Sequence, residues 1–360
     1  MKKTIVHIID NLGRGGAETM LVAVTKQLPE YNNIIVTLSP ENDFGAELEC
    51  NTIFCLNLKS VLLAPVAAIK LRAIIKKNKV AMVHSHLFWS TVVARMGVPK
   101  NIPLITTIHA FVASSIEYQP WKMRMLERLT YKIRKSTILT VAKGALDEYF
   151  NLIKVKPHQA QALYTFVDPL VFNETNNNGS KIKNNHFKLV TVGNLKEQKN
   201  HRFLLDAFKL LKNENISLDI YGKGPLDKTL QKQIDAAQLN IHLKGQVANI
   251  QQQLNQYDLF VMSSLYEGFA LSVLEAMALG MPLLLSDIVS FREQCADTAL
   301  YFNLDNPGDF AEKLIALKNN PDHLINLGAA AKKRVLQNFT LEKHMLQLKT
   351  IYAAALEGGE

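Results

Sequence analysis

The feature that most constrains the fold of this chain is a regular alternation of short apolar segments with longer amphipathic ones. The short segments are rich in β-branched residues, as buried strands are, and the segments between them carry apolar residues at helical spacing. Parallel strands need crossover connections, usually helices, and a sheet covered on both faces has near-continuous apolar strands. The alternation therefore predicts an α/β fold with parallel, doubly wound sheets.

The alternation is interrupted once, which predicts two domains. Expected strands occupy residues 4–10, 33–38, 52–58, 80–86, 103–109, 137–142, 187–193, 217–222, 241–245, 259–264, 282–287 and 299–303. Between the two sets, residues 173–186 are Asn-rich and poor in apolar residues, as linkers are. We expect Rossmann-like domains at 1–168 and 187–338, a linker at 169–186 and a final helix within 339–360. Ligands of such sheets bind at the carboxyl ends of the strands, so we expect a site in a cleft between the domains.

The net charge of the chain is distributed unevenly between these halves. The chain carries 41 Lys and Arg against 32 Asp and Glu, a net charge of +9. Residues 1–170 hold 21 basic and 12 acidic residues, which accounts for the whole excess. This asymmetry argues against a nucleic-acid-binding protein and suggests an anionic membrane surface as a partner of the first domain.

Two basic segments of the first half, 66–80 and 120–136, interleave their charges with apolar residues. Each basic residue near an anionic leaflet contributes about 1 kcal/mol, so a few suffice for reversible peripheral binding. The alternative is that the helix in 120–136 packs inward by its apolar stripe and leaves its charges solvated.

Cysteines and apolar runs bear on the location of the protein. Cys50, Cys55 and Cys295 show no metal-ligand spacing, and their odd number fits a reducing, cytoplasmic setting. His7 and Asp10 interrupt the first apolar run, which we interpret as a strand and not as a signal peptide. No run approaches the roughly 18 apolar residues of a spanning helix. We expect a cytoplasmic protein, peripheral at most on the inner face of a membrane.

The strongest candidate site lies in residues 263–282, where a strand, a glycine turn and a helix follow one another. A helix beginning near Phe269 would leave the backbone N–H groups of Phe269, Ala270 and Leu271 unpaired and suited to phosphate or sugar oxygens. Glu267 and Glu275 could accept hydrogen bonds from sugar hydroxyls. Taken alone, two such glutamates could equally be surface residues of an ordinary helix.

This segment resembles the signature of retaining glycosyltransferases of family four, E-G-F-G-x-x-x-x-E-A-M-A-x-G-x-P, and here reads E-G-F-A-L-S-V-L-E-A-M-A-L-G-M-P. The resemblance implies the GT-B fold, in which the last helix returns to the N-terminal domain. It also implies that Glu267 contacts the donor sugar, that the amides of residues 269–271 serve sugar and diphosphate, and that Glu275 holds the ribose. Ala270 stands where the family has glycine.

A second segment, 192–201, resembles the family element G-R-L-x-x-x-K-G. Lys199 occupies the lysine position, where the resemblance implies a diphosphate clamp. Asn194 replaces the arginine, so a charge-assisted hydrogen bond of about 1.5–3 kcal/mol becomes a neutral one of about 0.5–1.5 kcal/mol. The strand-end residues where the family places the nucleotide base are Gly245, Gln246 and Val247.

The first domain offers weaker candidates. Gly15 and Gly16 follow the first strand and look like the family's G-G-A-E element near the donor diphosphate. His109 ends a strand at the position where the family has a histidine near the reaction centre. His84 and His86 end another strand and are further candidates. Lone glycine turns and lone histidines are often purely structural.

Together these features predict a hexosyltransferase-type, retaining glycosyltransferase with His109 and Glu267 as catalytic residues. The resemblance implies transfer from a UDP- or GDP-sugar to a glycan or lipid-linked acceptor in bacterial-type cell-surface polysaccharide synthesis. D-x-D, H-E-x-x-H and P-loop motifs do not occur, so we predict neither a metal nor another cofactor. A non-catalytic nucleotide-sugar-binding scaffold subunit, a nucleotide-sugar epimerase and a phosphorylase are the alternatives.

Overall fold

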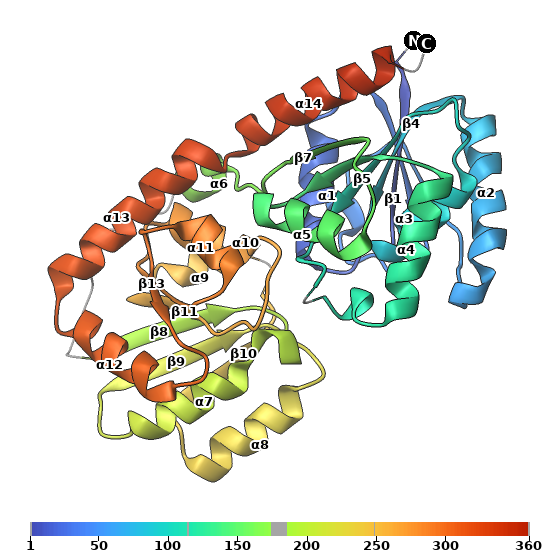
Figure 1. The fold of residues 1–360 in the computed structure, drawn as a ribbon. Helices are drawn as coiled ribbons and strands as arrows, with labels where there is room; N and C mark the ends of the chain where they lie inside the picture. The colour runs from blue at the N-terminus through green and yellow to red at the C-terminus, as the bar shows by residue number, and fades with distance from the viewer. Residues whose placement is uncertain (1, 114, 174–185, 248, 359–360) are drawn as a thin grey trace. The chain divides into compact units, whose positions relative to one another are not determined.

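The structure is a computed structural model that describes residues 2–113, 115–173, 186–247 and 249–358. They form two compact units, one of Met1–Thr165 with Glu342–Glu360 and one of Phe166–Leu341. Each unit contains one fully parallel sheet covered by helices (Figure 1). Most of the expected linker, residues 174–185, lies outside the described residues, and residues 169–173 of it form the short helix α6 (Pro169–Asn173).

The first unit is built on a seven-stranded sheet with the order β3-β2-β1-β4-β5-β6-β7. Its strands are β1 (Thr4–Ile9), β2 (Asn32–Thr37), β3 (Thr52–Cys55), β4 (Val80–His86), β5 (Leu104–Ile108), β6 (Thr137–Thr140) and β7 (Gln159–Ala162). Its helices are α1 (Gly16–Lys26), α2 (Ala64–Lys77), α3 (Phe88–Gly97), α4 (Trp121–Ile133) and α5 (Lys143–Ile153), joined by α14 (Leu341–Glu357) from the end of the chain. The sequence predicted the first six strands, while β7 escaped notice because its sequence, QAQA, carries no apolar run.

Apolar residues on both sides of the central strands explain why helices cover both faces of this sheet. Val6 of β1 lies in one buried cluster with Leu71 of α2 and Val93 of α3. The other face carries Ile9 of β1 in a cluster with Leu21 of α1. The near-continuous apolar strands expected from the sequence are therefore used on both faces.

Helix α14 completes the first unit although it lies at the other end of the sequence. Its Tyr352 is fully buried, and the hydroxyl lies 2.6 Å from Nδ1 of His84 on β4. His344 of the same helix places Nδ1 2.7 Å from the carbonyl oxygen of Tyr164. These polar contacts fix the orientation of the helix on the unit that begins the chain.

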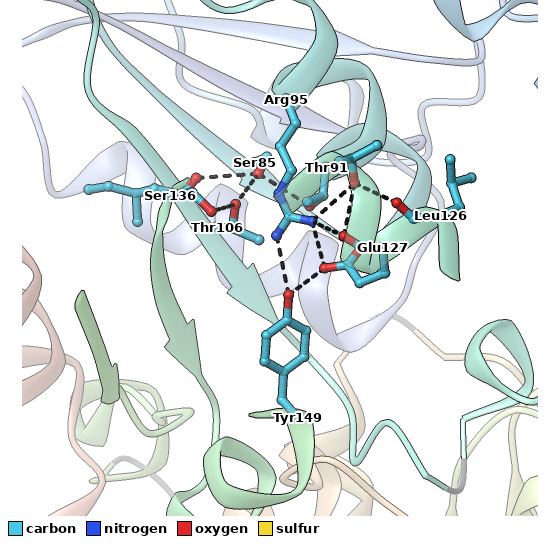
Figure 2. Close-up of polar contacts among 10 residues, drawn as sticks. Ser85, Thr91, Arg95, Thr106, Leu126, Glu127, Ser136 and Tyr149 are labelled. Carbon is cyan, nitrogen blue, oxygen red and sulfur yellow. Dashed lines mark hydrogen bonds and ion pairs between the residues drawn. The ribbon is translucent and has the colours of Figure 1, made fainter. Parts of the chain in front are cut away.

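Helix α4 packs inward through Tyr131, Met123 and Leu126 and also buries a charged side chain. Its Glu127 accepts a hydrogen bond from Arg95 of α3 at 2.7 Å, and neither side chain of this ion pair is exposed. The hydroxyl of Tyr149 on α5 donates to the same carboxylate oxygen, so three helices converge on one buried charge (Figure 2). An arginine with fixed, directional donors suits such a buried pair.

The second unit is built on a six-stranded sheet with the order β10-β9-β8-β11-β12-β13. Its strands are β8 (Phe187–Val192), β9 (Ile216–Tyr221), β10 (Ile241–Gly245), β11 (Leu259–Met262), β12 (Leu283–Ser286) and β13 (Leu300–Phe302). Its helices, besides α6, are α7 (His201–Leu210), α8 (Asp227–Ala237), α9 (Ile250–Leu254), α10 (Leu271–Ala278), α11 (Val289–Cys295), α12 (Pro307–Lys318) and α13 (Pro321–Asn338). All six strands were predicted to within two residues at each end.

The backbone conformation after α10 explains the glycine that ends the motif, and the packing of α13 on this turn explains a second glycine. Gly280 follows α10 with φ of +71°, a left-handed conformation that favours glycine. Gly328 of α13 lies so close to this turn that a Cβ there would approach the Gly280 carbonyl oxygen to 2.1 Å.

Among the described residues, no helix is both long and apolar enough to cross a membrane.

Candidate functional site

The predicted site residues of the second unit gather at one edge of its sheet. Strands β10, β9, β8 and β11 are consecutive neighbours and parallel, so their carboxyl ends share an edge. The loops that follow β10, β8 and β11 carry every residue that the sequence proposed for this unit, except Gly245, the last residue of β10, and Leu271 and Glu275 of α10. Ligands of doubly wound sheets bind at this edge.

The centre of the site is a buried cluster around Glu267. Lys199 Nζ donates to Glu267 Oε1 at 2.7 Å, and the two side chains are 14% and 8% exposed. The hydroxyl of Ser264 donates to the same oxygen at 2.6 Å. Lys199 reaches this position by crossing Gly193, where a Cβ would come within 2.9 Å of the lysine Cε. The structure thus joins two motifs that are 68 residues apart in the sequence.

The loop that carries Glu267 is held from both sides. Leu265 donates its backbone N–H to the Gln198 carbonyl, and the Gln198 side chain donates back to the Tyr266 carbonyl, each at 2.9 Å. The Ser286 hydroxyl of β12 donates to the Ser264 carbonyl at 2.7 Å. Sequence reasoning missed Gln198, Ser264 and Ser286, because their contacts appear only after three strands are placed side by side.

The expectation about free amides at the helix start is wrong for Ala270. Helix α10 begins at Leu271, two residues later than predicted, with Ala270 as its extended N-cap. The side chain of Gln294, from α11, accepts from the Ala270 N–H at 3.0 Å and donates to the Ala270 carbonyl at 2.9 Å. Phe269 lies before the helix and packs on Phe339. Of the three predicted amides, only that of Leu271 belongs to the first turn.

Glu275 lies within α10 and is electrostatically unusual. Burial raises the pKa of its carboxyl group to about 7, so the charged form is disfavoured in the surroundings it has here. A carboxyl that titrates near neutral pH is a common property of functional sites. No polar partner of this side chain is recorded among the described residues, which leaves its oxygens available to hydroxyl groups.

The remaining candidates of this unit lie at the surface. Asn194 is exposed, as is the neighbouring Lys196. Gln246 and Val247 are exposed beyond the end of β10, and Gly245 has φ of +70° and accepts a backbone hydrogen bond from Gly222. These residues belong to the same sheet edge as the cluster around Glu267.

In the first unit, the glycine candidates follow β1. Gly15 is the N-cap of α1 in an extended conformation, and Gly16 is the first helical residue. A Cβ at Gly16 would meet no atom within 4 Å, whereas at Gly15 it would touch the carboxylate of Glu18. The fold itself therefore does not require glycine at position 16.

His84 and His86 lie at the end of β4, and His109 follows β5, which is the neighbouring strand of the same sheet. Nδ1 of His86 lies 3.2 Å from Nε2 of His109, and Nε2 of His84 lies 2.7 Å from the Thr107 hydroxyl. Burial lowers the pKa of His109 to about 4, and that of His84 and His86 well below the usual value. A cavity of about 20 Å³, room for one water molecule, is lined by these three rings with Thr107, His344 and apolar residues of α1 and α14.

His7, on β1, extends this group, and its spacing to His84 and His86 could hold a metal ion. One nitrogen of each ring lies within 4.8 Å of the others. Both ring nitrogens of His84 are, however, already in hydrogen bonds with the hydroxyls of Tyr352 and Thr107. A third ligand would therefore cost an existing buried hydrogen bond, and the donor set does not favour a metal.

Two doubly wound units, each with candidate residues at the carboxyl edge of a parallel sheet, define the class of GT-B folds. The structure of Anabaena Alr3699/HepE in complex with UDP and glucose superposes with a TM-score of 0.85, at 16% identity, over 97% of this chain and 99% of that one. The predicted fold class is confirmed.

Family models assign the chain more closely. The model described as glycosyltransferase family 4 matches residues 14–169, and the model described as glycosyl transferases group 1 matches residues 172–334. The chain belongs to glycosyltransferase family four, the group 1 glycosyl transferases, as the sequence resemblance implied.

Named relatives are similar over most of their length. N-acetyl-alpha-D-glucosaminyl L-malate synthase of Bacillus anthracis is 26% identical over 72% of this chain and 70% of its own length. UDP-Gal:alpha-D-GlcNAc-diphosphoundecaprenol alpha-1,3-galactosyltransferase of Escherichia coli is 24% identical over 79% of this chain and 78% of its own length.

Proposed function

We propose that the protein transfers a hexosyl-type sugar from a UDP- or GDP-linked donor to a glycan or lipid-linked acceptor in bacterial-type cell-surface polysaccharide synthesis. Family membership supports the glycosyltransferase class, and the Escherichia coli relative is named for transfer to a diphosphoundecaprenol-linked sugar. In this proposal the second unit binds the donor and the basic first unit binds the acceptor.

The observation that carries the proposal is the partly buried Lys199–Glu267 pair at the sheet edge. A lysine ammonium and backbone amides suit a diphosphate, and a carboxylate suits sugar hydroxyls. We assign the diphosphate to Lys199, Asn194, Gly15, Gly16 and the amide of Leu271. Glu267 and His109 act at the donor sugar, Glu275 at the ribose, and Gly245, Gln246 and Val247 at the base. Phe269 and Ala270 shape the sugar pocket.

A substitution series tests these assignments. We expect Lys199→Ala and Glu267→Ala each to lower transfer roughly 100-fold, because each removes an interaction with charge that develops at the donor. The matched control is Lys209→Ala, which breaks an exposed ion pair with Asp206 of the same 2.7 Å length. Transfer is followed by nucleotide release from a panel of nucleotide sugars, with thermal unfolding to confirm folding. Wild-type rates in both site variants would reject the assignment.

The proposal includes retention of anomeric configuration and independence of metal ions. Retention rests on the family resemblance, and proton NMR of the freshly formed product tests it through the anomeric coupling. Metal independence rests on the sequence, where Lys199 takes the place of a D-x-D clamp. We expect activity to persist in excess EDTA, and its complete loss with recovery on adding Mg²⁺ or Mn²⁺ would contradict this part.

A scaffold function is the second candidate, and Asn194 is the observation that favours it. The exposed amide replaces a charged donor-binding side chain. Binding of a nucleotide sugar without transfer or hydrolysis would support a scaffold, and formation of an isomeric nucleotide sugar would instead indicate an epimerase. Asn194→Arg is expected to raise the transfer rate if catalysis is the function.

We also propose that the first unit contacts an anionic membrane surface through the outer row of α4. This row consists of Trp121, Met125, Leu129 and Ile133, which are 61%, 45%, 49% and 71% exposed. The alternative that α4 packs inward by an apolar stripe holds for Met123, Leu126 and Tyr131, which pack against the buried core, whereas the outer row lies on the opposite, exposed side. Exposed basic residues flank the row, namely Lys122, Arg128 and Lys132. Apolar and basic rows side by side are typical of helices that lie in a membrane interface.

Vesicle sedimentation tests the outer row of α4. We expect more protein to pellet with phosphatidylglycerol vesicles than with phosphatidylcholine vesicles, and the difference to shrink in Leu129→Ser/Ile133→Ser. The matched control is Leu346→Ser on α14, an apolar side chain that is 70% exposed. Equal pelleting with neutral and anionic vesicles would reject the proposal without affecting the donor site.

A further inference from the structure

His86 and His109 form a hydrogen bond whose direction depends on which ring nitrogen of each residue carries its proton. Nδ1 of His86 and Nε2 of His109 are 3.2 Å apart, and the ring centroids are 5.5 Å apart. Burial lowers the pKa of both rings, to about 4 for His109, so both are neutral at neutral pH. A neutral imidazole has one N–H donor and one lone pair. The bond between them therefore has one of two directions.

The two directions leave the same atom of His86, Nε2, without a partner but in different protonation states. If His109 donated, the proton of His86 would sit on Nε2, which is buried and has no hydrogen-bond partner in the described part of the chain. If His86 donates, that same Nε2 is a bare lone pair. A buried N–H without an acceptor is rarer in proteins than a buried acceptor without a donor.

Among the described residues, no side chain next to His86 offers an acceptor that would reverse this choice. The ring of His84 is 4.2 Å away between centroids, but both its nitrogens already bond to hydroxyls. The ring of His7 stacks on His86 with the centroids 6.0 Å apart, but no hydrogen bond joins the two rings. We infer that His86 donates its Nδ1–H to Nε2 of His109 and so fixes His109 in its Nδ1–H tautomer.

This tautomer decides what His109 can do. Its Nε2 lone pair is occupied by His86, and its free nitrogen carries a proton. His109 therefore acts as a neutral hydrogen-bond donor and not as a general base. This step rests on the proposed function: His109 donates its hydrogen bond to an oxygen of the donor sugar. His86 is a positioning residue that does not itself touch the substrate.

Nitrogen NMR of the full-length protein tests the tautomer without reference to activity. In ¹⁵N-histidine-labelled protein, protonated and bare ring nitrogens resonate far apart, and His109→Gln identifies the His109 signals. We expect a protonated Nδ1 and a bare Nε2 in the wild type and in His86→Asn, whose amide N–H lies where the Nδ1–H was. In His86→Leu we expect the Nε2–H form, which an unconstrained neutral histidine favours. His7→Leu, a buried neighbour without a bond to His109, should retain the wild-type tautomer.

Kinetics connects the tautomer to the reaction. We expect His86→Leu to lower kcat roughly tenfold with little change in KM, and His86→Asn to recover most of it, as the loss and return of one hydrogen bond predict. A protonated Nε2 on His109 in the wild type would overturn the inference. If the wild type showed the expected tautomer but His109→Gln still transferred sugar at the wild-type rate, the proposed role of His109 would be rejected and its tautomer would stand.

Discussion

At the scale of single residues, Glu275 shows how a candidate binding group can oppose stability. Its pKa is about 7 in the folded chain, against 4.5 for an ordinary glutamate. Between these values the folded chain holds a proton that the unfolded chain has released, so this carboxyl lowers stability as pH rises, and fully so above pH 7. The partial exposure of the side chain reduces the effect to about 2 kcal/mol.

We therefore expect Glu275→Gln to raise the free energy of unfolding by about 2 kcal/mol near pH 8 and to change it little near pH 4. Urea denaturation at both pH values measures this difference. The same substitution should weaken donor binding in calorimetry, if the carboxylate holds the ribose. A stability gain that is equal at both pH values would show that the charge is not its cause.

The candidate residues could be located from sequence, but their partners could not. Motif spacing placed Lys199 and Glu267 in one site because glycine turns and strand ends are local signals. Gln294 acts on Ala270 across 24 residues, and nothing local in either segment predicts the contact. The same limit hid the pairing of His86 with His109, which depends on β4 and β5 being neighbours.

At the scale of elements, the observed strands and helices differ from the predicted ones mainly where contacts with other segments decide the structure. Strand β11 was predicted through Ser264 and ends at Met262, because Ser263 and Ser264 use their hydroxyls to hold the site loop. Helix α11 was not predicted, since its seven residues are too few to show a helical period. Helix α4 was predicted, but which of its faces is buried depends on Arg95 of another helix.

The buried pair of Arg95 and Glu127 gives an element-scale prediction. Arg95→Met should lower the free energy of unfolding by about 3–5 kcal/mol, because it leaves the Glu127 carboxylate buried without its counter-ion (Figure 2). Lys209→Met, at an exposed pair, should change it by less than about 1 kcal/mol. Arg95→Met/Glu127→Leu should recover much of the loss, and urea denaturation measures all three. Failure of the double variant to recover would show that packing, and not the charge, is responsible.

At the scale of the whole molecule, the two units differ in which of their titratable groups have a pKa that burial shifts. The first unit contains five histidines whose pKa is lowered by burial, namely His7, His84, His86, His109 and His344. The second unit has His201 of this kind, together with Glu275, whose pKa is shifted in the opposite direction. The division of the chain into units was visible in the sequence, whereas this chemical asymmetry depends on which histidines face the interior.

The asymmetry predicts that acid destabilises the first unit more than the second. Below about pH 6.5 the unfolded chain binds protons at these histidines that the folded unit does not bind, so stability falls with pH until about pH 4. In the second unit, lowering the pH below 6.5 also costs stability at His201. Protonation of Glu275 over the same range removes a destabilising buried charge and offsets part of that loss. Both tryptophans, Trp89 and Trp121, belong to the first unit, so their fluorescence reports its unfolding alone. Between about pH 7.5 and pH 5 the fluorescence midpoint in urea should fall further than the midpoint of far-UV circular dichroism, to which both units contribute, and equal shifts would contradict this account.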